Sequence, residues 1–388
     1  GEDTVRDFVF AFRNAFGGGI NRPFFQILNM DAEEFDAEFR GWLRRKYEPF
    51  SDRGTPREYG RPFRVEGAEY AQLSSPAISP SGDLVAAFTT HENDVDVALF
   101  GIPDRRLYKN LTKGYTTDYE YLVAQGLTVA PAEGRDLAFS PDGDRIAVLA
   151  RTERARSLLL LDALRGGISE RHEIPLPIDQ ATQPAFRPDG RAVAFQAVLA
   201  GRHDIFEIEL ATGEVTNLTD DASYDASPTY SPDGASLVYS SDVGEDLKLI
   251  RLDLGDRTRR AQLTFGPGND EGAAFSADGR RLYFASDRLD GVLDIYGLDL
   301  ETRKLKRLTY VVGAATNPVP GDTPDGERVG FQAYSRGSWG LYAADPNRGE
   351  DAGVSEPPTE VEEYVPFLPA VSITVDPAKA QDLGRRKL

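Results

Sequence analysis

Short apolar runs alternate with short polar turns along most of the chain, at the spacing of strands rather than of long helices. One polar phrase, Ser-Pro-Asp-Gly or a close variant, recurs six times before such runs. Its six copies begin at Ser79, Ser140, Arg187, Ser231, Ser276 and Thr323. Their glycines are 61, 47, 44, 45 and 47 residues apart. A period in the forties with strands throughout is typical of the blades of a β-propeller.

Each copy of the repeat contains the signals of four strands. In the phrase itself, proline presets φ, aspartate can bond its own backbone and glycine accepts a positive φ, which predicts a tight turn between the first two strands. An aspartate opens several third strands, as in Asp204-Ile205-Phe206 and Asp294-Ile295-Tyr296. A Leu-Thr pair ends the fourth strand at Leu111-Thr112, Leu218-Thr219, Leu263-Thr264 and Leu308-Thr309. One such blade cannot bury both faces, so neighbouring blades must stack into a ring.

The repeat therefore predicts an all-β fold, a six-bladed β-propeller with a short N-terminal α-helical segment. We expect a helical segment over residues 1–47, which would be the end of an upstream domain, and a linker over 48–60. The propeller is expected over 61–348. Residues 349–388 have the composition of a Pro/Glu-rich linker, followed by the start of a further domain if there is one.

The last copy of the repeat lacks a recognisable fourth strand. We expect residues 63–65 to pair into the blade that contains residues 339–344, since closing the ring removes exposed sheet edges. The chain begins at Gly1, close to a helix and without a visible signal peptide. We interpret it as a fragment or processed product, so the missing signal says nothing about export.

The clearest helix signal covers residues 32–46. Asp31 is a good N-cap residue, and Glu34 follows at the spacing of a capping box. Four large apolar residues recur on one face of this helix: Phe35, Phe39, Trp42 and Leu43. Such a stripe needs a partner surface, either the propeller or a missing upstream domain.

Composition narrows the classes of partner. The 388 residues include no cysteine, which excludes disulfides and thiolate metal sites. The formal charge of −19 argues against nucleic acid and anionic membranes as partners. No apolar run is long enough to span a bilayer, so we expect no direct membrane insertion by this chain.

The repeat resembles the WD40-like repeat of the TolB-type propeller family over roughly residues 61–346. The best copy runs from Ala274 to Thr309 and contains Ser286-Asp287, Gly291, Asp294-Ile295-Tyr296 and Leu308-Thr309. The resemblance implies a propeller that binds partners in the cell envelope or serves as an accessory domain of a peptidase. The α/β domain that precedes the propeller in the family's name-giving member has no counterpart here.

The N-terminal helices resemble the end of a zinc-metallopeptidase domain of the gluzincin type. The stretch that carries this resemblance is Ala15-Phe16-Gly17-Gly18-Gly19, followed by residues 30–47. In some envelope proteins such a domain precedes a propeller of this kind.

Catalytic motifs are missing from the sequence. His91-Glu92 and His172-Glu173 are followed by no second histidine at the spacing of a zinc peptidase, and we interpret the three histidines as surface-loop residues. A Gly-x-Ser-x-Gly nucleophile elbow is also absent. We interpret Gly17-Gly18-Gly19 as a helix cap or turn. The sequence predicts no catalytic residues, no metal ligands and no enzyme activity, although the full-length parent could be a peptidase.

Two Asn-Leu-Thr triplets, at Asn110 and Asn217, match the N-glycosylation acceptor. Their Leu-Thr pairs occupy the repeat position that ends a fourth strand elsewhere. We therefore interpret them as structural.

Acidic residues gather in the loops that lie opposite the Ser-Pro-Asp-Gly turns. Those expected nearest the channel mouth are Asp221, Asp225, Asp270, Glu271, Asp287 and Asp290. Three explanations remain open: solvation of turns by self-capping aspartates, a docking face for a basic or polar partner, and a calcium site. Apart from that calcium alternative, we expect no cofactor.

The leading hypothesis is a non-catalytic protein-binding or scaffold propeller of the bacterial cell envelope, periplasmic or otherwise extracytoplasmic. Its partner would be a protein or peptide of basic or polar character, and not nucleic acid. The alternative is an accessory propeller, gating or docking substrates, of a metallopeptidase or other peptidase whose catalytic domain lies outside this chain.

Overall fold

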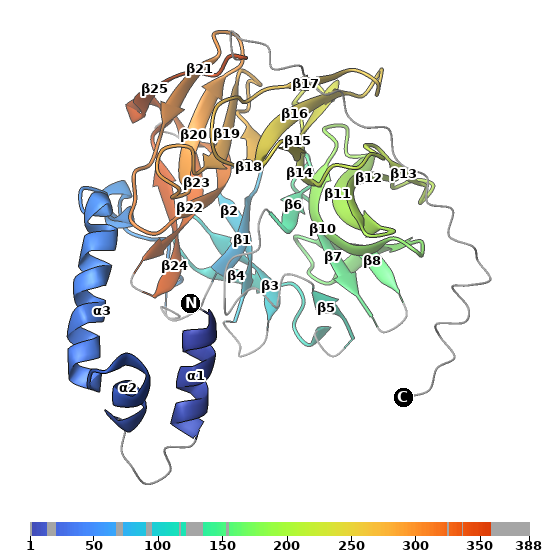
Figure 1. Ribbon diagram of the computed structural model, residues 1–388. Helices are drawn as coiled ribbons and strands as arrows, with labels where there is room; N and C mark the ends of the chain where they lie inside the picture. Colours follow the sequence, from blue (N-terminus) through green and yellow to red (C-terminus); the bar gives the residue numbers. More distant parts are fainter. Residues whose placement is uncertain are drawn as a thin grey trace. The chain divides into compact units, whose positions relative to one another are not determined.

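The computed structural model describes residues 2–13, 21–66, 73–90, 95–115, 118–121, 135–152, 155–323, 326–335 and 337–357. The chain forms two compact units, Gly1–Gly54 and Thr55–Leu388. The first is helical and the second consists of strands (Figure 1).

The helical unit contains α1 (Glu2–Arg13), α2 (Asn21–Leu28), α3 (Ala32–Tyr47) and a short 3₁₀ turn, η1 (Glu48–Phe50). The predicted capping box at the start of α3 is confirmed. The Asp31 carboxylate accepts from the backbone N–H of Glu34 at 2.8 Å, and the Glu34 carboxylate accepts from the N–H of Asp31 at 2.9 Å. These bonds satisfy donors that the first turn of a helix leaves unpaired.

The aromatic stripe of α3 continues onto the other two helices. Ring centroids lie 4.9 Å apart between Phe8 and Phe24, 5.2 Å between Phe24 and Phe35, and 5.8 Å between Phe39 and Trp42. The rings therefore contact one another across all three helices. Trp42 still keeps 46% of its surface exposed.

The strands form six antiparallel sheets, the blades of the predicted propeller. Blade 1 consists of β1 (Leu73–Ile78), β2 (Leu84–Thr89), β3 (Asp96–Gly101) and β4 (Leu107–Asn110). Blade 2 consists of β5 (Glu120–Tyr121), β6 (Leu137–Phe139), β7 (Arg145–Arg151), β8 (Arg156–Asp162) and β9 (Ile168–Ile174). Blade 3 consists of β10 (Asp179–Phe186), β11 (Ala192–Leu199), β12 (Arg202–Glu209) and β13 (Val215–Asn217).

The second half of the ring repeats this plan with changes at its end. Blade 4 consists of β14 (Asp225–Tyr230), β15 (Ser236–Val243), β16 (Asp246–Asp253) and β17 (Arg260–Gln262). Blade 5 consists of β18 (Asp270–Phe275), β19 (Arg281–Ser286), β20 (Asp294–Asp299), β21 (Lys304–Arg307) and β25 (Glu350–Val354). Blade 6 consists of β22 (Ala315–Thr323), β23 (Gly326–Ser335) and β24 (Ser338–Ala344). Around the ring, the first strands of neighbouring blades contact each other: β1–β6, β6–β10, β10–β14, β14–β18, β18–β22 and β22–β1.

The repeated phrase forms the predicted turn between first and second strands. In blade 2 the Ser140 hydroxyl donates to Asp142 at 2.5 Å, and the Asp142 carboxylate accepts from the Asp144 N–H at 3.1 Å. The hydrogen bond from Ser140 lowers the pKa of Asp142. Gly143 has φ +78°, and a side chain there would lie 3.5 Å from the ring of Pro80. The turn thus packs against the proline of the preceding blade.

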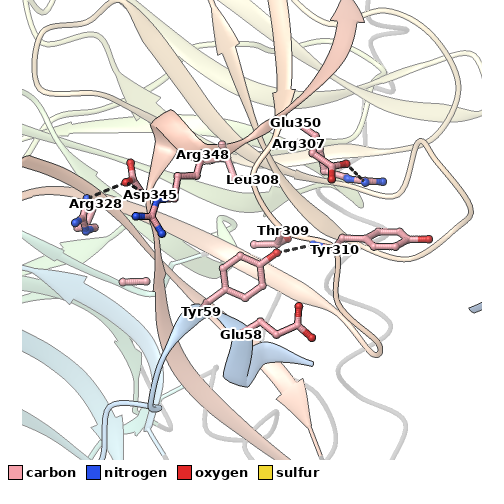
Figure 2. A pocket seen from close by; sticks show the side chains of 11 residues that line it. Glu58, Tyr59, Arg307, Leu308, Thr309, Tyr310, Arg328, Asp345, Arg348 and Glu350 are labelled. Carbon is pink, nitrogen blue, oxygen red and sulfur yellow. Dashed lines mark hydrogen bonds and ion pairs between the residues drawn. The ribbon is translucent and has the colours of Figure 1, made fainter. Parts of the chain in front are cut away.

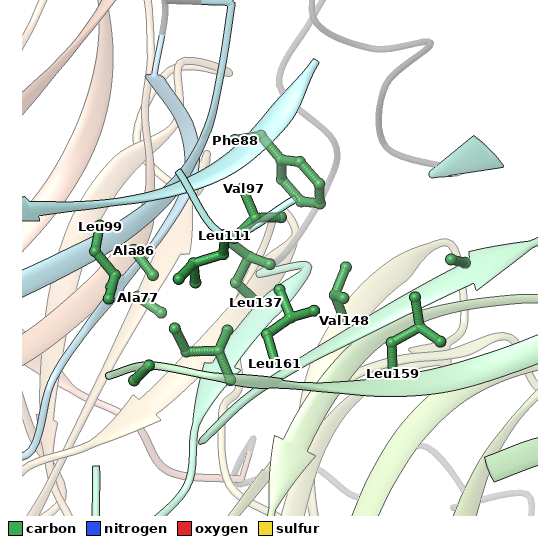
Figure 3. Packing of buried hydrophobic residues seen from close by; sticks show 13 residues of the cluster. Ala77, Ala86, Phe88, Val97, Leu99, Leu111, Leu137, Val148, Leu159 and Leu161 are labelled. Atoms are coloured by element: carbon green, nitrogen blue, oxygen red, sulfur yellow. The ribbon is translucent and has the colours of Figure 1, made fainter. Parts of the chain in front are cut away.

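The hydrophobic core is a ring of six clusters, one at each interface between blades. Figure 3 shows the cluster between blades 1 and 2, where Phe88 and Leu99 approach Val148 and Leu161. These side chains come from the middle of second and third strands, where both sheet faces are covered. Their burial supplies the main force that holds the blades together.

The ring closes where the sequence predicted, but among the described residues only one backbone bridge joins the closing segment to blade 6. The Phe63 N–H donates to the Leu341 carbonyl at 2.7 Å, and Phe63 and Leu341 form an isolated antiparallel pair. Pro62 has no N–H to extend this pairing, and the Glu66 N–H already bonds the Arg105 carbonyl of blade 1 at 2.8 Å. Val65, 2% exposed, packs in the cluster between blades 6 and 1.

The linker prediction for residues 349–388 is wrong at its start. Residues 350–354 form β25, which pairs with β21 and extends blade 5. All five side chains of β25 are exposed, so no alternation of apolar and polar residues marked it as a strand. Ser355 anchors its end, since its N–H donates to the Arg303 carbonyl at 2.9 Å and its hydroxyl accepts from the Phe265 N–H at 3.0 Å.

The longest interval between repeat copies corresponds to an interrupted first strand in blade 2. Both β5 and β6 pair with β7, β5 at its C-terminal end and β6 nearer its start. The additional residues of the 61-residue interval therefore lie between two pieces that share one strand position.

Candidate functional site

The first strands of blades 1, 3, 4, 5 and 6 carry a bulge where they line the central channel, and a residue with positive φ sits at each of them. These residues are Ser75, Gln183, Ser227, Gly272 and Asn317, with φ between 48° and 64°. Several bond their neighbours around the ring. The Ser227 N–H donates to the Gln183 side-chain oxygen at 2.6 Å, and the Ser75 hydroxyl donates to Asp136 at 2.9 Å. A belt of polar side chains therefore connects blades 1 to 4 inside the channel.

Asp136 is the charged member of this belt. It is 5% exposed and also accepts from the Gln183 N–H, at 3.3 Å. Burial raises the pKa of Asp136 to about 7, against the lowering effect of the bonds from Ser75 and Gln183. The carboxyl group therefore changes charge near neutral pH.

Arg135 crosses the channel from blade 2 to the far side of the ring. Its guanidinium donates to the Ala273 carbonyl of β18 at 2.5 Å and to the Pro318 carbonyl of β22 at 3.3 Å. Burial lowers the pKa of Arg135 to about 10. Arg135 thus ties blade 2 to blades 5 and 6.

The turn-side mouth of the channel is a funnel of about 460 Å³ lined by all six blades. Its wall contains aromatic rings and prolines next to Arg135. Representative lining residues are Phe139, Pro141, Phe186, Tyr230, Phe275 and Pro320.

The loop-side mouth holds the six predicted acidic residues, in three different environments. Asp225 and Asp270, the first residues of β14 and β18, are fully buried, and Asp221 is 6% exposed. Glu271 and Asp287 are half-buried, and Asp290 is exposed. The structure brings the set together on blades 4 and 5 and the loop that leads into blade 4.

Basic side chains accompany two of the three buried aspartates. Arg288 contacts Asp270 at 2.6 Å, and Lys248 lies 3.8 Å from its other oxygen. Arg260 pairs with Asp221. These basic residues lie 18 to 39 residues from their aspartates in sequence, so a local spacing pattern could not predict the ion pairs.

Asp225 differs from these ion pairs. It accepts from the Ser241 hydroxyl at 2.6 Å. Burial, with a smaller contribution from the Asp221 carboxylate, raises the pKa of Asp225 to about 8. Of the other members of the set, Asp287 accepts from the Asn269 N–H at 2.6 Å, 18 residues away in sequence, and Asp290 accepts from the nearby Val292 N–H at 3.3 Å.

Within the described residues, no group of three or more His, Cys, Asp or Glu side chains is arranged to hold a metal ion. None of the helices described is both long and apolar enough to cross a bilayer. His91, Glu92 and residues 15–19 lie outside the described part of the chain.

The Asn-Leu-Thr triplets have the structural role that the repeat predicted. The Asn217 amide donates to Asp204 at 3.0 Å, and the Thr219 hydroxyl accepts from the Ile205 N–H at 3.1 Å. Asn110 bonds Asp96 in the same way at 2.8 Å. The Leu-Thr pair therefore fastens each fourth strand to the start of the third.

The interpretation of the histidines as surface-loop residues is wrong for two of them. His172 lies in β9 and His203 in β12. His172 is 3.4 Å from Glu170, and His203 contacts the Gln196 amide at 3.1 Å. A period-two strand pattern does not distinguish such half-buried polar positions from loop residues.

A further cavity of about 370 Å³ lies on the outer side of blades 5 and 6 (Figure 2). It is bordered by Tyr59, in the 3₁₀ turn η2 (Pro56–Tyr59), whose hydroxyl accepts from the Tyr310 N–H at 3.0 Å. Burial raises the pKa of Tyr59. Arg307 pairs with Glu350 of the adjacent strand at one side of it, and Arg328 lies 3.6 Å from Asp345.

Comparisons with known proteins agree with this architecture. A family model for the TolB beta propeller domain matches residues 136–256. An uncharacterized protein of Agrobacterium fabrum is 34% identical over 107 residues, 27% of this chain and 34% of that protein. The Tol-Pal system protein TolB of Francisella tularensis is 26% identical over 166 residues, 42% of this chain and 38% of TolB. The chain thus spans little more than a third of the length of these relatives.

Two solved structures share the fold. A protein assigned as TolB from Agrobacterium tumefaciens has a TM-score of 0.52 at 17% identity, over 70% of this chain and 89% of that one. A puromycin hydrolase has a TM-score of 0.50 at 17% identity, over 78% of this chain and 48% of the hydrolase. The resemblance to TolB-type propellers is confirmed, and the gluzincin resemblance stays a prediction.

Proposed function

Because the chain is a TolB-like six-bladed propeller, we propose that it is a non-catalytic protein-binding module of the bacterial cell envelope, periplasmic or otherwise extracytoplasmic. The observation that carries this proposal is the sequence similarity to the Tol-Pal system protein TolB over 166 residues. The partner is a protein or peptide of basic or polar character.

The partner contacts the loop-side mouth around blades 4 and 5. Two features support this placement. The ion pairs Asp270–Arg288 and Asp221–Arg260 hold the loops in place, while the Asp290 carboxylate is exposed to solvent. A rigid base under exposed carboxylates keeps the ordering entropy of binding low. The net charge of −19 adds long-range attraction for a cationic partner.

Site-specific photo-crosslinking tests the proposal. A photoreactive residue replaces Asp290 on the loop side or Arg280 on the turn side of the same blade; both positions are exposed. In cell envelopes, we expect one discrete protein adduct from position 290 and none from position 280. Adducts from position 280 alone would assign the partner to the opposite face, and no adduct from either would remove the protein-binding role.

The second candidate is an accessory propeller of a hydrolase. The observation in its favour is the shared fold with puromycin hydrolase, of which the matched region makes up 48%. Here the catalytic domain, of a metallopeptidase or another peptidase, would lie outside this chain. Peptide hydrolysis by the full-length parent, lost when the catalytic domain is inactivated, would favour this candidate over a scaffold.

A further inference from the structure

The ring seam carries a groove whose lining meets that of the turn-side funnel at Ile78 and Val319. It contains three chambers, each of which shares lining residues with the next. The first is the polar cavity of Figure 2, which shares Tyr59 and Ala343 with an apolar chamber of about 240 Å³. The apolar chamber shares Arg61 and Arg105 with a third chamber of about 530 Å³. We call this surface the seam groove.

The third chamber is basic. Four of its six lining residues are arginines, and the other two are Gly60 and Pro62; the arginines are Arg57, Arg61, Arg64 and Arg105. All four are exposed, and in the described part of the chain none makes an ion pair. By contrast, the adjacent Arg106 pairs with Glu66 at 2.7 Å. A chain with a net charge of −19 thus collects four uncompensated positive charges in one chamber.

Four like charges around one chamber repel one another, and an anion bound there removes that repulsion. Guanidinium groups bind carboxylates through paired N–H donors. The neighbouring apolar chamber is lined by Phe63, Ile102 and Leu341, which suit one large apolar side chain. Since Arg61 and Arg105 border both chambers, one short ligand reaches the two environments together.

The strand beside the groove indicates that this ligand is a peptide. On its outer side β24 has, among the described residues, only the bridge from Leu341 to Phe63. Ala343 of β24 is exposed and lines the groove. An incompletely paired strand edge accepts the backbone of an extended peptide. In such a peptide, side chains two positions apart lie roughly 6.6 Å apart on one side.

We propose that the seam groove binds an acidic peptide segment of a partner protein, with an apolar side chain in the chamber of Phe63 and carboxylates among the four arginines. This surface goes beyond the proposed function, because it recognises acidic rather than basic chemistry and lies at the ring seam. A free phosphate compound or an anionic lipid would use the arginines without the strand edge or the apolar chamber.

Fluorescence anisotropy with the whole purified chain tests this. The probe is a labelled synthetic peptide with one leucine flanked by glutamates. Matched probes replace the glutamates by glutamines, or the leucine by glycine. We expect the first probe to bind and both matched probes to bind more weakly. The variant R61Q/R64Q should weaken binding roughly tenfold, since each exposed ion pair contributes about 0.2–1 kcal/mol.

The control variant R257Q/R280Q removes two exposed positive charges that, in the described structure, also lack ion pairs. It should leave binding unchanged. Equal weakening by both double variants would reduce the effect to general electrostatics and overturn the site. Failure of the first probe, with leucine and glutamates, to bind would also overturn the site. Binding of pyrophosphate or of phosphatidylglycerol vesicles that depends on Arg61 and Arg64, without binding of the peptide, would replace the peptide by a phosphate ligand.

Discussion

Replacing Asp136 by asparagine should stabilise the propeller increasingly as the pH rises. The pKa of Asp136 in the folded protein is about 7, against an ordinary value of 3.8. When the pH rises between these values, the carboxyl group ionises in the unfolded chain but stays protonated in the folded one. Each pH unit in this window therefore lowers the stability of the wild type by about 1.4 kcal/mol. An asparagine at this position does not titrate.

The size of the change in stability depends on how much of the pH range between the two pKa values is crossed. Between about pH 5.5 and pH 7 the wild type loses ~2 kcal/mol through this group, and nothing further above its folded pKa. The hydrogen bonds from Ser75 and Gln183 change in the variant, but equally at both pH values. Asp225 titrates in both proteins, so its contribution cancels. The difference in unfolding free energy between variant and wild type should therefore increase by ~2 kcal/mol.

Guanidinium unfolding of both proteins at about pH 5.5 and pH 8 measures this difference, provided that the slope with denaturant is unchanged. Asp142→Asn is the matched control. The pKa of Asp142 is lowered in the folded state, so its contribution is complete above the unfolded pKa and is lost only in acid. Its effect on stability should be the same at both pH values. An Asp136→Asn difference that does not grow with pH would refute a buried, protonated carboxyl in the belt.

Three further predictions concern the seam, the repeat and the chemistry. Val65→Ala should lower the unfolding free energy by about 1–3 kcal/mol in denaturant titrations, because Val65 is 2% exposed in the cluster that closes the ring; an unchanged midpoint would contradict closure through this segment. Thr219→Val should cost about 1–3 kcal/mol by leaving the Ile205 N–H unpaired, whereas Thr302→Val in an exposed turn should cost less. The isolated chain should not hydrolyse a peptide library or simple esters; activity abolished by a chelator or a serine-directed inhibitor would disprove this.

The repeat made the fold predictable because its signals are local. The turn at Ser140, Asp142 and Gly143 is specified within a few residues, and its recurrence fixes the number of blades. The closing segment was predictable by counting strands, since the last copy lacked one. That this segment forms only one bridge among the described residues was not predictable, because the pairing ends where the Glu66 N–H bonds the Arg105 carbonyl of blade 1.

The candidate sites were predictable only in part, because they depend on distant partners. Repeat geometry placed Asp225 and Asp270 at equivalent strand starts, but their burial and the approach of Arg288 follow from packing. Arg135 belongs to no repeat position, and nothing in its surroundings shows that it reaches blades 5 and 6. The exposed strand β25 has no alternation of buried and exposed residues from which it could be predicted. The arginines of the third chamber lie close together in sequence except Arg105, which is near them because its carbonyl accepts from the Glu66 N–H.

The bridge between Phe63 and Leu341 also determines how early during synthesis the ring can close. The two residues are 278 positions apart, so the interface they close cannot form until nearly the whole propeller has left the ribosome. At about 5–20 residues per second, that wait is roughly 15–55 s. During it, the cluster that contains Val85 and Phe100 lacks Leu341, its contribution from blade 6, although blades 1 to 5 can already dock in order. The nascent chain therefore keeps one edge of the ring open, at the end that is made first, until synthesis of the propeller is nearly finished.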